Sequence, residues 1–383
     1  MNETLNNFTL NINLSLAGRR TLPLVILEST LFLVLDVSAL LGNSLLCIAV
    51  WKYQSFRTIT NVFIFSLALT DLLTAVLVLP FGMVSSFADR WMFGGIGCQI
   101  YRFTGYCLVG VSLSILAMLA FERYSRVSNA DFHLKVFSMK GATIMNLVIW
   151  CMTCGLVAVV FPLMGVKFQL ASNNPTICLT VFNNRTASLL FNSVHTVYFL
   201  LPCTVMLWCY TRLYKIICKH NATVLPTLHL VIPIQSATKH ERASTFQDTS
   251  PGTSRTQQNS NQVFTPALHM NCLVKRKAFY LPGLMSRQVL SSSGENDARQ
   301  AIEEKKLFRM LAVVLIGFII CWLPGFVFGI TEIAKPIAND TLQYLNLFYY
   351  FPAYTSSMIN PIIFGTMSKR FRDAFKNILF CRR

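Results

Sequence analysis

The chain has 383 residues, of which 54% are hydrophobic and only 13% are charged, and its formal net charge is +17. This composition excludes an ordinary soluble globular protein, which needs a larger share of polar surface. In a membrane protein, the excess of Lys and Arg indicates topology and contact with anionic lipid rather than nucleic-acid binding.

Seven apolar runs follow one another along the chain, each close to the ~20 residues that a helix needs to cross a bilayer. Uninterrupted runs of this length favour helices over the alternating strands of a membrane barrel. The predicted helices span about residues 24–51, 60–87, 97–127, 141–164, 187–218, 299–331 and 341–366. We therefore expect an all-α integral membrane protein, a bundle of seven transmembrane helices.

The distribution of positive charge predicts the orientation. With residues 1–23 as an extracellular tail, only seven of the 33 Lys and Arg residues lie in outer segments, as the positive-inside rule requires. The tail lacks the pattern of a removable signal peptide, so the first helix is expected to direct insertion. The predicted location is the plasma membrane, with the C-terminus in the cytoplasm. Predicted glycosylation sites on the outer side are Asn2, Asn7, Asn13, Asn184 and Asn339.

Two cysteines differ from the others. Cys98 and Cys178 lie at the predicted outer surface, where disulfides persist, whereas seven further cysteines lie inside apolar runs and pack as small hydrophobic residues. A Cys98–Cys178 disulfide would connect the start of the third helix to the loop between the fourth and fifth helices.

The predicted cytoplasmic side contains two further segments. Residues 219–298 are rich in Ser, Thr, Gln and Asn, so we expect a mostly disordered insert. Residues 369–383 carry apolar residues at helical spacing among basic ones, which predicts a short amphipathic eighth helix on the membrane surface. Cys381 in this segment is a candidate palmitoylation site, with an unmodified thiol as the alternative.

Each predicted helix carries one short marker. The markers, in order, are Gly42-Asn43, Leu67-Ala68-Leu69-Thr70-Asp71, Glu122-Arg123-Tyr124, Trp150, Pro202 with Tyr210, Phe318 with Cys321-Trp322-Leu323-Pro324, and Asn360-Pro361-Ile362-Ile363-Phe364. Together with Trp91-Met92-Phe93-Gly94 before Cys98, they give the chain a resemblance to the rhodopsin-like (class A) G-protein-coupled receptors. The resemblance implies a receptor without enzymatic activity that activates a heterotrimeric G protein, with arrestin and a receptor kinase as further partners.

The resemblance also implies a switch. Arg123 would pair with Glu304 between the third and sixth helices at rest, and the sixth helix would swing outward about Pro324 on activation. The implied switch residues are Glu122, Arg123, Tyr124, Tyr210, Glu304, Phe318, Trp322, Pro324, Asn360, Pro361 and Phe364. One alternative is that Glu304 only caps its helix and Arg123 pairs only with Glu122. The other is that the two aromatic residues Phe318 and Trp322 only pack in the core. Phe364 replaces the tyrosine that is usual in the family.

The family resemblance further implies a sodium ion near the middle of the membrane and no other cofactor. Its predicted ligands are Asp71, Ser112, Ser357 and Asn360, and a water-filled polar network without an ion is the alternative.

The predicted ligand pocket is aromatic and carries one cation. Its predicted wall consists of Arg102, Gly105, Tyr106, Val109, His195, Tyr198, Trp322, Phe326, Tyr350 and Tyr354, and it suits a small-molecule, lipid or peptide ligand. Arg102 would pair with a ligand carboxylate, with Asp89 or with lipid phosphate, and His195 is either a ligand contact or a core histidine.

These residues do not suit two classes of ligand that bind to members of the family. Gly105 stands where aminergic receptors carry an aspartate, and Tyr354 stands where opsins carry the retinal-binding lysine. A non-photosensory receptor derived from an opsin stays an alternative. A channel or transporter is a weaker one, because it would be expected to carry charged pore-lining residues in several helices.

Overall fold

The computed structural model describes residues 21–170, 178–182, 184–241, 306–327, 348 and 351–381. Two compact units can be distinguished: one contains residues 1–211 and 297–383, and the other contains residues 212–296. The first unit holds the helical bundle. Its elements are α2 (Leu22–Lys52), η1 (Gln54–Phe56), α3 (Ile59–Leu77), α4 (Leu79–Phe87), α5 (Gly94–Ser128), α6 (Ala130–Val136), α7 (Met139–Leu163), the first part of α8 (Arg185–Glu241), a helix spanning Lys306–Val327, α11 (Phe351–Met367) and α12 (Lys369–Leu379).

The predicted all-α membrane bundle is confirmed. Within the described residues, six helical stretches are long and apolar enough to cross a membrane: Leu22–Lys52, Ile59–Phe87, Gly94–Ser128, Met139–Leu163, Arg185–Cys218 and Lys306–Val327. The place of the seventh span is taken by α11. Many large apolar side chains of these helices are exposed, such as those of Trp51 and Leu163. An apolar exterior of this extent is what lipid, rather than water, solvates.

The second predicted span is divided into α3 and α4. The two helices meet at Val78, and Pro80 lies in the first turn of α4. Proline lacks a backbone N–H and fits the first turn of a helix but not its interior, so the chain begins a new helix here. Pro361 stays inside α11, and Pro324 stays inside the Lys306–Val327 helix.

Two elements differ from the sequence prediction in kind or extent. Strands β1 (Val166–Leu170) and β2 (Cys178–Phe182) pair antiparallel, with Val166 opposite Phe182, although no strand was expected. The helix α8 continues to Glu241, so the predicted boundary at residue 218 lies inside a helix. No glycine occurs between residues 219 and 241 to end it. Residues 242–305 lie outside the described part of the chain.

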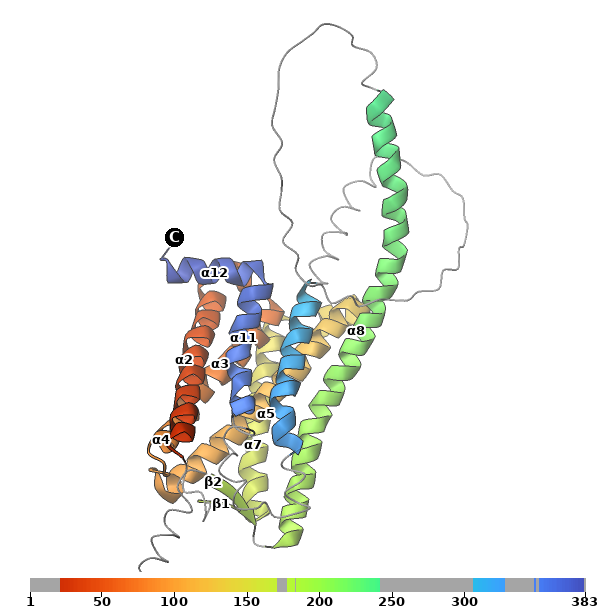
Figure 1. Cartoon of the computed structure of the whole chain (residues 1–383). Helices are drawn as coiled ribbons and strands as arrows, with labels where there is room; N and C mark the ends of the chain where they lie inside the picture. Colours follow the sequence, from red (N-terminus) through yellow and green to blue (C-terminus); the bar gives the residue numbers. More distant parts are fainter. Residues whose placement is uncertain are drawn as a thin grey trace, which may run out of the picture. The chain divides into compact units, whose positions relative to one another are not determined.

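The two ends of the bundle carry different elements. Figure 1 shows the β1–β2 hairpin at one end and α12 across the other, beside the ends of α2 and α11. We call these the hairpin end and the α12 end. Near the middle, α2 and α11 approach closely, because a Cβ built at Gly42 would lie 2.5 Å from Cγ of Pro361.

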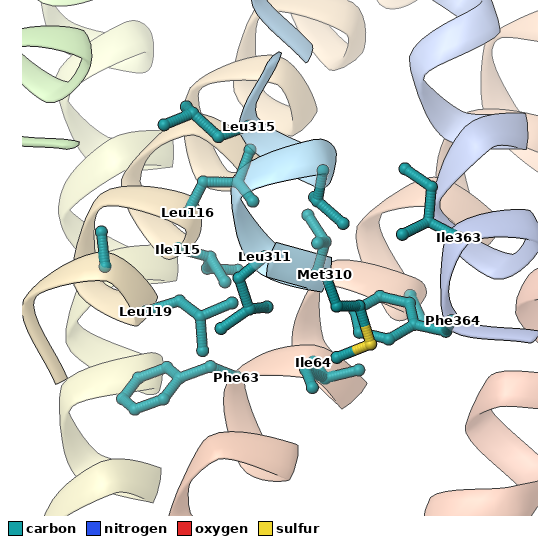
Figure 2. Close-up of a cluster of buried hydrophobic side chains, with 14 of the residues drawn as sticks. Phe63, Ile64, Ile115, Leu116, Leu119, Met310, Leu311, Leu315, Ile363 and Phe364 are labelled. Atoms are coloured by element: carbon teal, nitrogen blue, oxygen red, sulfur yellow. The ribbon is translucent and has the colours of Figure 1, made fainter. Parts of the chain in front are cut away.

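The largest apolar core lies toward the α12 end. Figure 2 shows that it joins side chains from α3, α5, the Lys306–Val327 helix and α11. Phe63, Leu119 and Phe364 are among its fully buried members. Dense packing of this kind is the main force between helices in lipid, where apolar burial from water no longer contributes. The core therefore fixes the positions of the helices that carry the polar residues described next.

Candidate functional site

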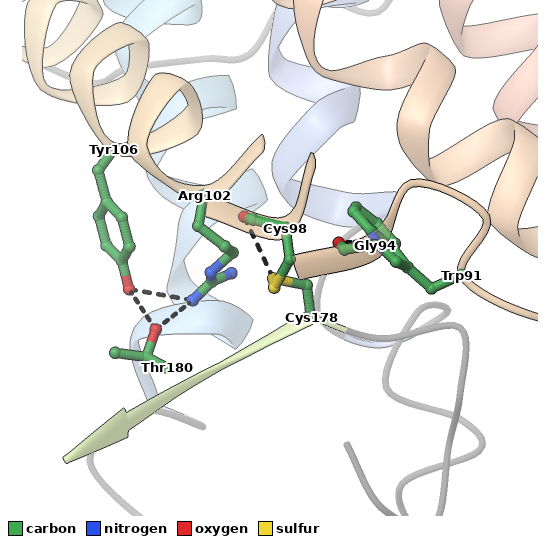
Figure 3. The surroundings of a disulfide bond; sticks show 7 residues. All are labelled: Trp91, Gly94, Cys98, Arg102, Tyr106, Cys178 and Thr180. Carbon is green, nitrogen blue, oxygen red and sulfur yellow. Dashed lines mark hydrogen bonds between the residues drawn. A yellow bond between two sulfur atoms is a disulfide. The ribbon is translucent and has the colours of Figure 1, made fainter. Parts of the chain in front are cut away.

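A disulfide fixes the hairpin to the bundle. Cys98 in the first turns of α5 is bonded to Cys178 at the start of β2, with a Cα–Cα distance of 5.7 Å. The Trp91 indole N–H donates to the backbone carbonyl of Gly94 (2.8 Å), which holds the preceding loop against the same helix end. Figure 3 shows β2 leaving the disulfide and passing close to the next turn of α5. The predicted cysteine pairing is thus present.

Arg102 lies one turn further along α5 and contacts β2. Its Nη2 atom donates to the Thr180 hydroxyl (2.9 Å) and to the Tyr106 hydroxyl (3.0 Å). The guanidinium carbon also lies 5.1 Å from the centre of the Tyr106 ring, which permits a cation–π interaction. A positive charge is therefore held in place at the hairpin end by two hydroxyl groups and one aromatic face (Figure 3).

Arg102 lines a cavity, which we call the central cavity. It contains about 700 Å³ of empty space, part of which is open to solvent. Its described lining residues are Tyr101, Arg102, Gly105, Tyr106, Val109, His195, Phe199, Trp322, Gly325, Phe326, Ala353 and Tyr354. Eight of the ten predicted pocket residues are among them.

The other two predicted residues lie elsewhere. Tyr350 lies outside the described residues. Tyr198 lines a second cavity, which we call the side cavity, between α5, α7 and α8. Tyr101, Phe199, Gly325 and Ala353 were not predicted. Tyr101 could have been found by helical spacing, because it lies four residues before Gly105 on the same face of α5. Its hydroxyl lies 2.6 Å from that of Tyr354.

The described wall of the central cavity carries formal charge of one sign only. Among the lining residues that the structure describes, Arg102 carries a positive charge and none is Asp or Glu. Gly105 leaves open space where a side chain would project, because a Cβ built there meets no heavy atom within 4 Å. The position thus offers room but no carboxylate to pair with an ammonium group.

A smaller polar cavity lies deeper in the bundle. It contains about 360 Å³ of empty space, and Asp71, Ser112, Ser356 and Ser357 contribute to its wall. The amide of Asn360 donates to Asp71 Oδ2 (2.7 Å), and the Ser112 hydroxyl donates to Thr70 Oγ1 (2.9 Å). Asp71 is buried. The carboxylate of Asp71 and the three serine hydroxyls supply oxygen ligands of the kind that hard cations prefer.

Trp322 lines both the central cavity and the polar cavity. Its indole N–H donates to the Ser356 hydroxyl (3.3 Å), and its ring stacks on Phe318 with the centroids 5.9 Å apart. Phe318 is buried and belongs to the apolar core described above. One side chain thus contacts the central cavity, the polar cavity and the core, two residues before Pro324.

Glu122 is the centre of a buried ionic cluster at the α12 end. Its carboxylate is fully buried and lies 3.2 Å from Nε of Arg123, 3.0 Å from Nη2 of Arg126 and 3.1 Å from Nε2 of His133. The Thr60 hydroxyl donates to Glu122 Oε2 (3.3 Å) and accepts a hydrogen bond from Nη2 of Arg123. The sequence predicts a Glu122–Arg123 pair, but not the contacts of Glu122 with Thr60, Arg126 and His133.

The helix α6 positions His133. The Asn129 side chain caps α6 by accepting from the Phe132 N–H (3.0 Å), and His133 is buried. An Asn at this place is a common helix start, so the pattern Asn129-Ala130-Asp131 could have predicted α6. The contact of His133 with Glu122 depends on how α6 folds back on α5, which local pattern does not specify.

The remaining predicted switch residues are spread along the bundle. Tyr124 packs against Trp208 with ring centroids 5.0 Å apart, and Tyr210 packs against Phe308 at 5.6 Å. Phe364 is fully buried and contacts Phe371 of α12 at 5.3 Å. Pro361 is buried in α11. Glu304 lies outside the described residues, so its pairing with Arg123 stays a prediction.

The predicted modification sites are mostly at the margins of the described chain. Cys381 is exposed just after α12, whose Phe371 and Ala374 are buried. Asn184 is exposed, and its side-chain oxygen accepts from the Ala187 N–H (2.7 Å) at the start of α8. The predicted sites Asn2, Asn7, Asn13 and Asn339 lie outside the described residues.

Comparison with known proteins gives consistent matches over nearly the whole chain. The model of the family described as "7 transmembrane receptor (rhodopsin family)" matches residues 42–364. An alpha-2A adrenergic receptor of Danio rerio is 28% identical over 94% of this chain and 93% of its own length. A 5-hydroxytryptamine receptor 1B of Vulpes vulpes is 25% identical over 94% of this chain and 87% of its own length. The G-protein coupled receptor moody of Drosophila pseudoobscura pseudoobscura is 23% identical, and the chain spans 52% of that protein's length.

Proposed function

Because the chain belongs to the rhodopsin family of seven-transmembrane receptors, we propose that it binds a ligand in the central cavity and activates a heterotrimeric G protein. Members of this family are multi-pass membrane receptors and not enzymes. The hairpin end would then face the outside of the cell, and Arg123 would face the G protein in the cytoplasm. Arrestin and a receptor kinase are proposed as further partners at the α12 end.

The observation that carries this proposal is the position of Trp322. Its side chain lines the central cavity, donates to Ser356 at the polar cavity and stacks on Phe318 in the core. A ligand that displaces Trp322 would disturb both contacts at once. Since Pro324 weakens the backbone of the same helix, the expected response is an outward movement of its α12 end.

The ligand is proposed to be neutral or anionic. The adrenergic and 5-hydroxytryptamine receptors among the relatives are named for amines, but they share only 28% and 25% identity with this chain. An amine would enter a cavity whose described lining contains Arg102 and no carboxylate, and an uncompensated ammonium beside a guanidinium is repelled.

Sodium is proposed as an allosteric ion of the polar cavity. Asp71, Ser112 and Ser357 fit a small hard cation, since they supply one carboxylate and two hydroxyl oxygens. Asn360 was predicted as a fourth ligand, but its amide N–H faces Asp71, so it would orient the carboxylate instead of binding the ion.

The proposal can be tested with the full-length receptor in lipid nanodiscs and a panel of purified G proteins. Guanine-nucleotide exchange should rise in the presence of the receptor and a ligand found by screening, and Arg123→Ala should abolish that rise. Lys140→Ala is the matched control, because Lys140 is exposed at the same end of the bundle and should leave exchange unchanged. If no G protein in the panel responds while a screened ligand binds, coupling to a G protein is refuted.

A further inference from the structure

The side cavity is an apolar space that the proposed function does not use. It contains about 570 Å³ of empty space, part of which is open to solvent. The described lining residues are Tyr106, Val109 and Leu113 of α5, Leu156, Val157, Val160 and Phe161 of α7, and Phe191, Val194, His195, Tyr198 and Phe199 of α8. Aliphatic and aromatic carbon makes up most of this wall, and none of the described residues is formally charged.

The side cavity and the central cavity share one wall. Tyr106, Val109, His195 and Phe199 line both spaces. The rings of Tyr106 and His195 meet edge to face with their centroids 5.7 Å apart. The two spaces therefore adjoin one another at these shared side chains.

The two spaces have opposite chemistry. Arg102 in the central cavity presents a planar guanidinium that matches a carboxylate, and the hydroxyls of Tyr106 and Thr180 lie within 3.0 Å of its Nη2 atom. The side cavity offers contacts for apolar atoms only, apart from two tyrosines and His195. A molecule that fills both must be anionic at one end and apolar at the other.

Resting on the proposed function, we propose that the ligand is an amphipathic carboxylic acid, with its acid group at Arg102 and its apolar chain in the side cavity. A carboxylate fits better than a phosphate monoester, since Arg102 is the single formal charge among the described lining residues and a phosphate brings nearly two negative charges.

The first experiment uses purified wild-type receptor and measures the thermal stability that each probe confers. The probes are octanoate, dodecanoate and oleate, each beside its primary alcohol, and dodecyl phosphate. We expect stabilisation by the acids that increases with chain length, with each alcohol at least about tenfold weaker because it loses the charge-assisted hydrogen bonds. Equal binding of acid and alcohol, tighter binding of dodecyl phosphate, or no binding of any acid would each overturn the proposal.

The second experiment assigns each end of the ligand to its cavity. Arg102→Gln should weaken every acid at least about tenfold and leave the alcohols unchanged. Val160→Phe should fill the side cavity and remove the gain from octanoate to dodecanoate while octanoate still binds. Val159→Phe is the control, because Val159 is the preceding residue of α7 and its side chain is exposed. A chain-length series that Val160→Phe leaves unchanged would show that the chain does not enter the side cavity.

Thermal stability and nucleotide exchange separate this inference from the proposed function. Acids that stabilise the receptor but raise exchange on no G protein would support the ligand class and refute coupling. A receptor that raises exchange with a different ligand, and that no acid stabilises, would refute the ligand class and support coupling.

Discussion

At the scale of single residues, Glu122 is held by a dense set of polar contacts. One buried carboxylate lies within 3.2 Å of two arginines and one histidine and also accepts from Thr60. A buried charge with several partners is expensive to remove in part, because the groups that are left behind keep their desolvation cost. The cluster therefore restrains Arg123, whichever partner Arg123 has on the sixth helix.

Replacing Glu122 by Gln should raise ligand-independent activity. The neutral amide no longer holds Arg123 by charge, and a bias of about 1 kcal/mol toward the active arrangement is a roughly fivefold change in its population. The measurement is nucleotide exchange without ligand at equal receptor concentration. His133→Phe, which keeps the α6 packing and removes only one partner, should have a smaller effect. An unchanged basal rate in Glu122→Gln would contradict the restraint.

A second prediction at the scale of residues concerns the binding of sodium in the polar cavity. Replacing sodium by N-methylglucamine should lower the unfolding temperature of the purified receptor, since an ion at ten times its dissociation constant stabilises the folded state by about 1.4 kcal/mol. Asp71→Asn should remove this dependence, because the amide keeps a similar shape without the charge. Potassium is the control for ionic strength. If the sodium effect persisted in Asp71→Asn, Asp71 would not hold the ion, and the polar cavity would be a polar network without an ion.

At the scale of elements, α5 and α8 approach each other closely at a glycine. A Cβ built at Gly110 of α5 would overlap the Tyr198 ring and hydroxyl of α8. Gly155 of α7 has nothing within 4 Å of a built Cβ and is exposed. The two glycines therefore have different roles. Gly110 permits α5 and α8 to pack closely, whereas Gly155 is exposed and restricts no contact.

Gly110→Ala should destabilise the receptor by about 1–3 kcal/mol, because overpacking forces neighbouring side chains or the backbone to shift. Gly155→Ala should be neutral or stabilise by up to about 1 kcal/mol, the ordinary helix preference for alanine. Thermal unfolding of the purified variants measures both. Tyr198→Phe, which removes the hydroxyl nearest the built Cβ, should recover part of the loss. Equal effects of the two alanine substitutions would contradict the close approach.

The disulfide restrains the hairpin by joining β2 to α5. The Cys98–Cys178 bond closes a loop with a sequence separation of 80 residues. Loop-closure entropy for a loop of this length corresponds to about 4–5 kcal/mol of stabilisation. Cys98→Ser with Cys178→Ser should therefore lower the unfolding temperature, and it should also release β2 from Arg102 and weaken acid binding. Cys151→Ser, at an exposed free cysteine of α7, is the control.

At the scale of the whole molecule, the sequence predicted the elements better than their contacts. The apolar runs located the membrane helices, because lipid imposes a length and an apolar composition that few other constraints resemble. Eight of the ten predicted pocket residues line the central cavity, and four of them (Arg102, Gly105, Tyr106 and Val109) lie on one face of α5 by simple helical period. The other four lie on other helices, at positions that the family resemblance implied.

What the sequence did not predict depends on contacts between distant segments. The β1–β2 pairing joins two short segments that no strong alternation marks, and its position follows from the disulfide. The meeting of Thr60, Glu122 and His133 brings together three helices, α3, α5 and α6. The periodicity of a single helix does not predict these contacts, because they depend on the direction that the chain takes in the turn after α5.

The contact between Thr180 and Arg102 has a consequence for the entropy of binding. An arginine side chain loses up to about 2 kcal/mol of rotamer freedom when it is fixed. Hydrogen bonds to Thr180 and Tyr106 already restrict Arg102, so folding, rather than the binding step, bears most of that loss. A residue in the hairpin thus preorganises a residue in the bundle, and affinity for an acid depends on a strand that contributes none of the described lining residues of either cavity.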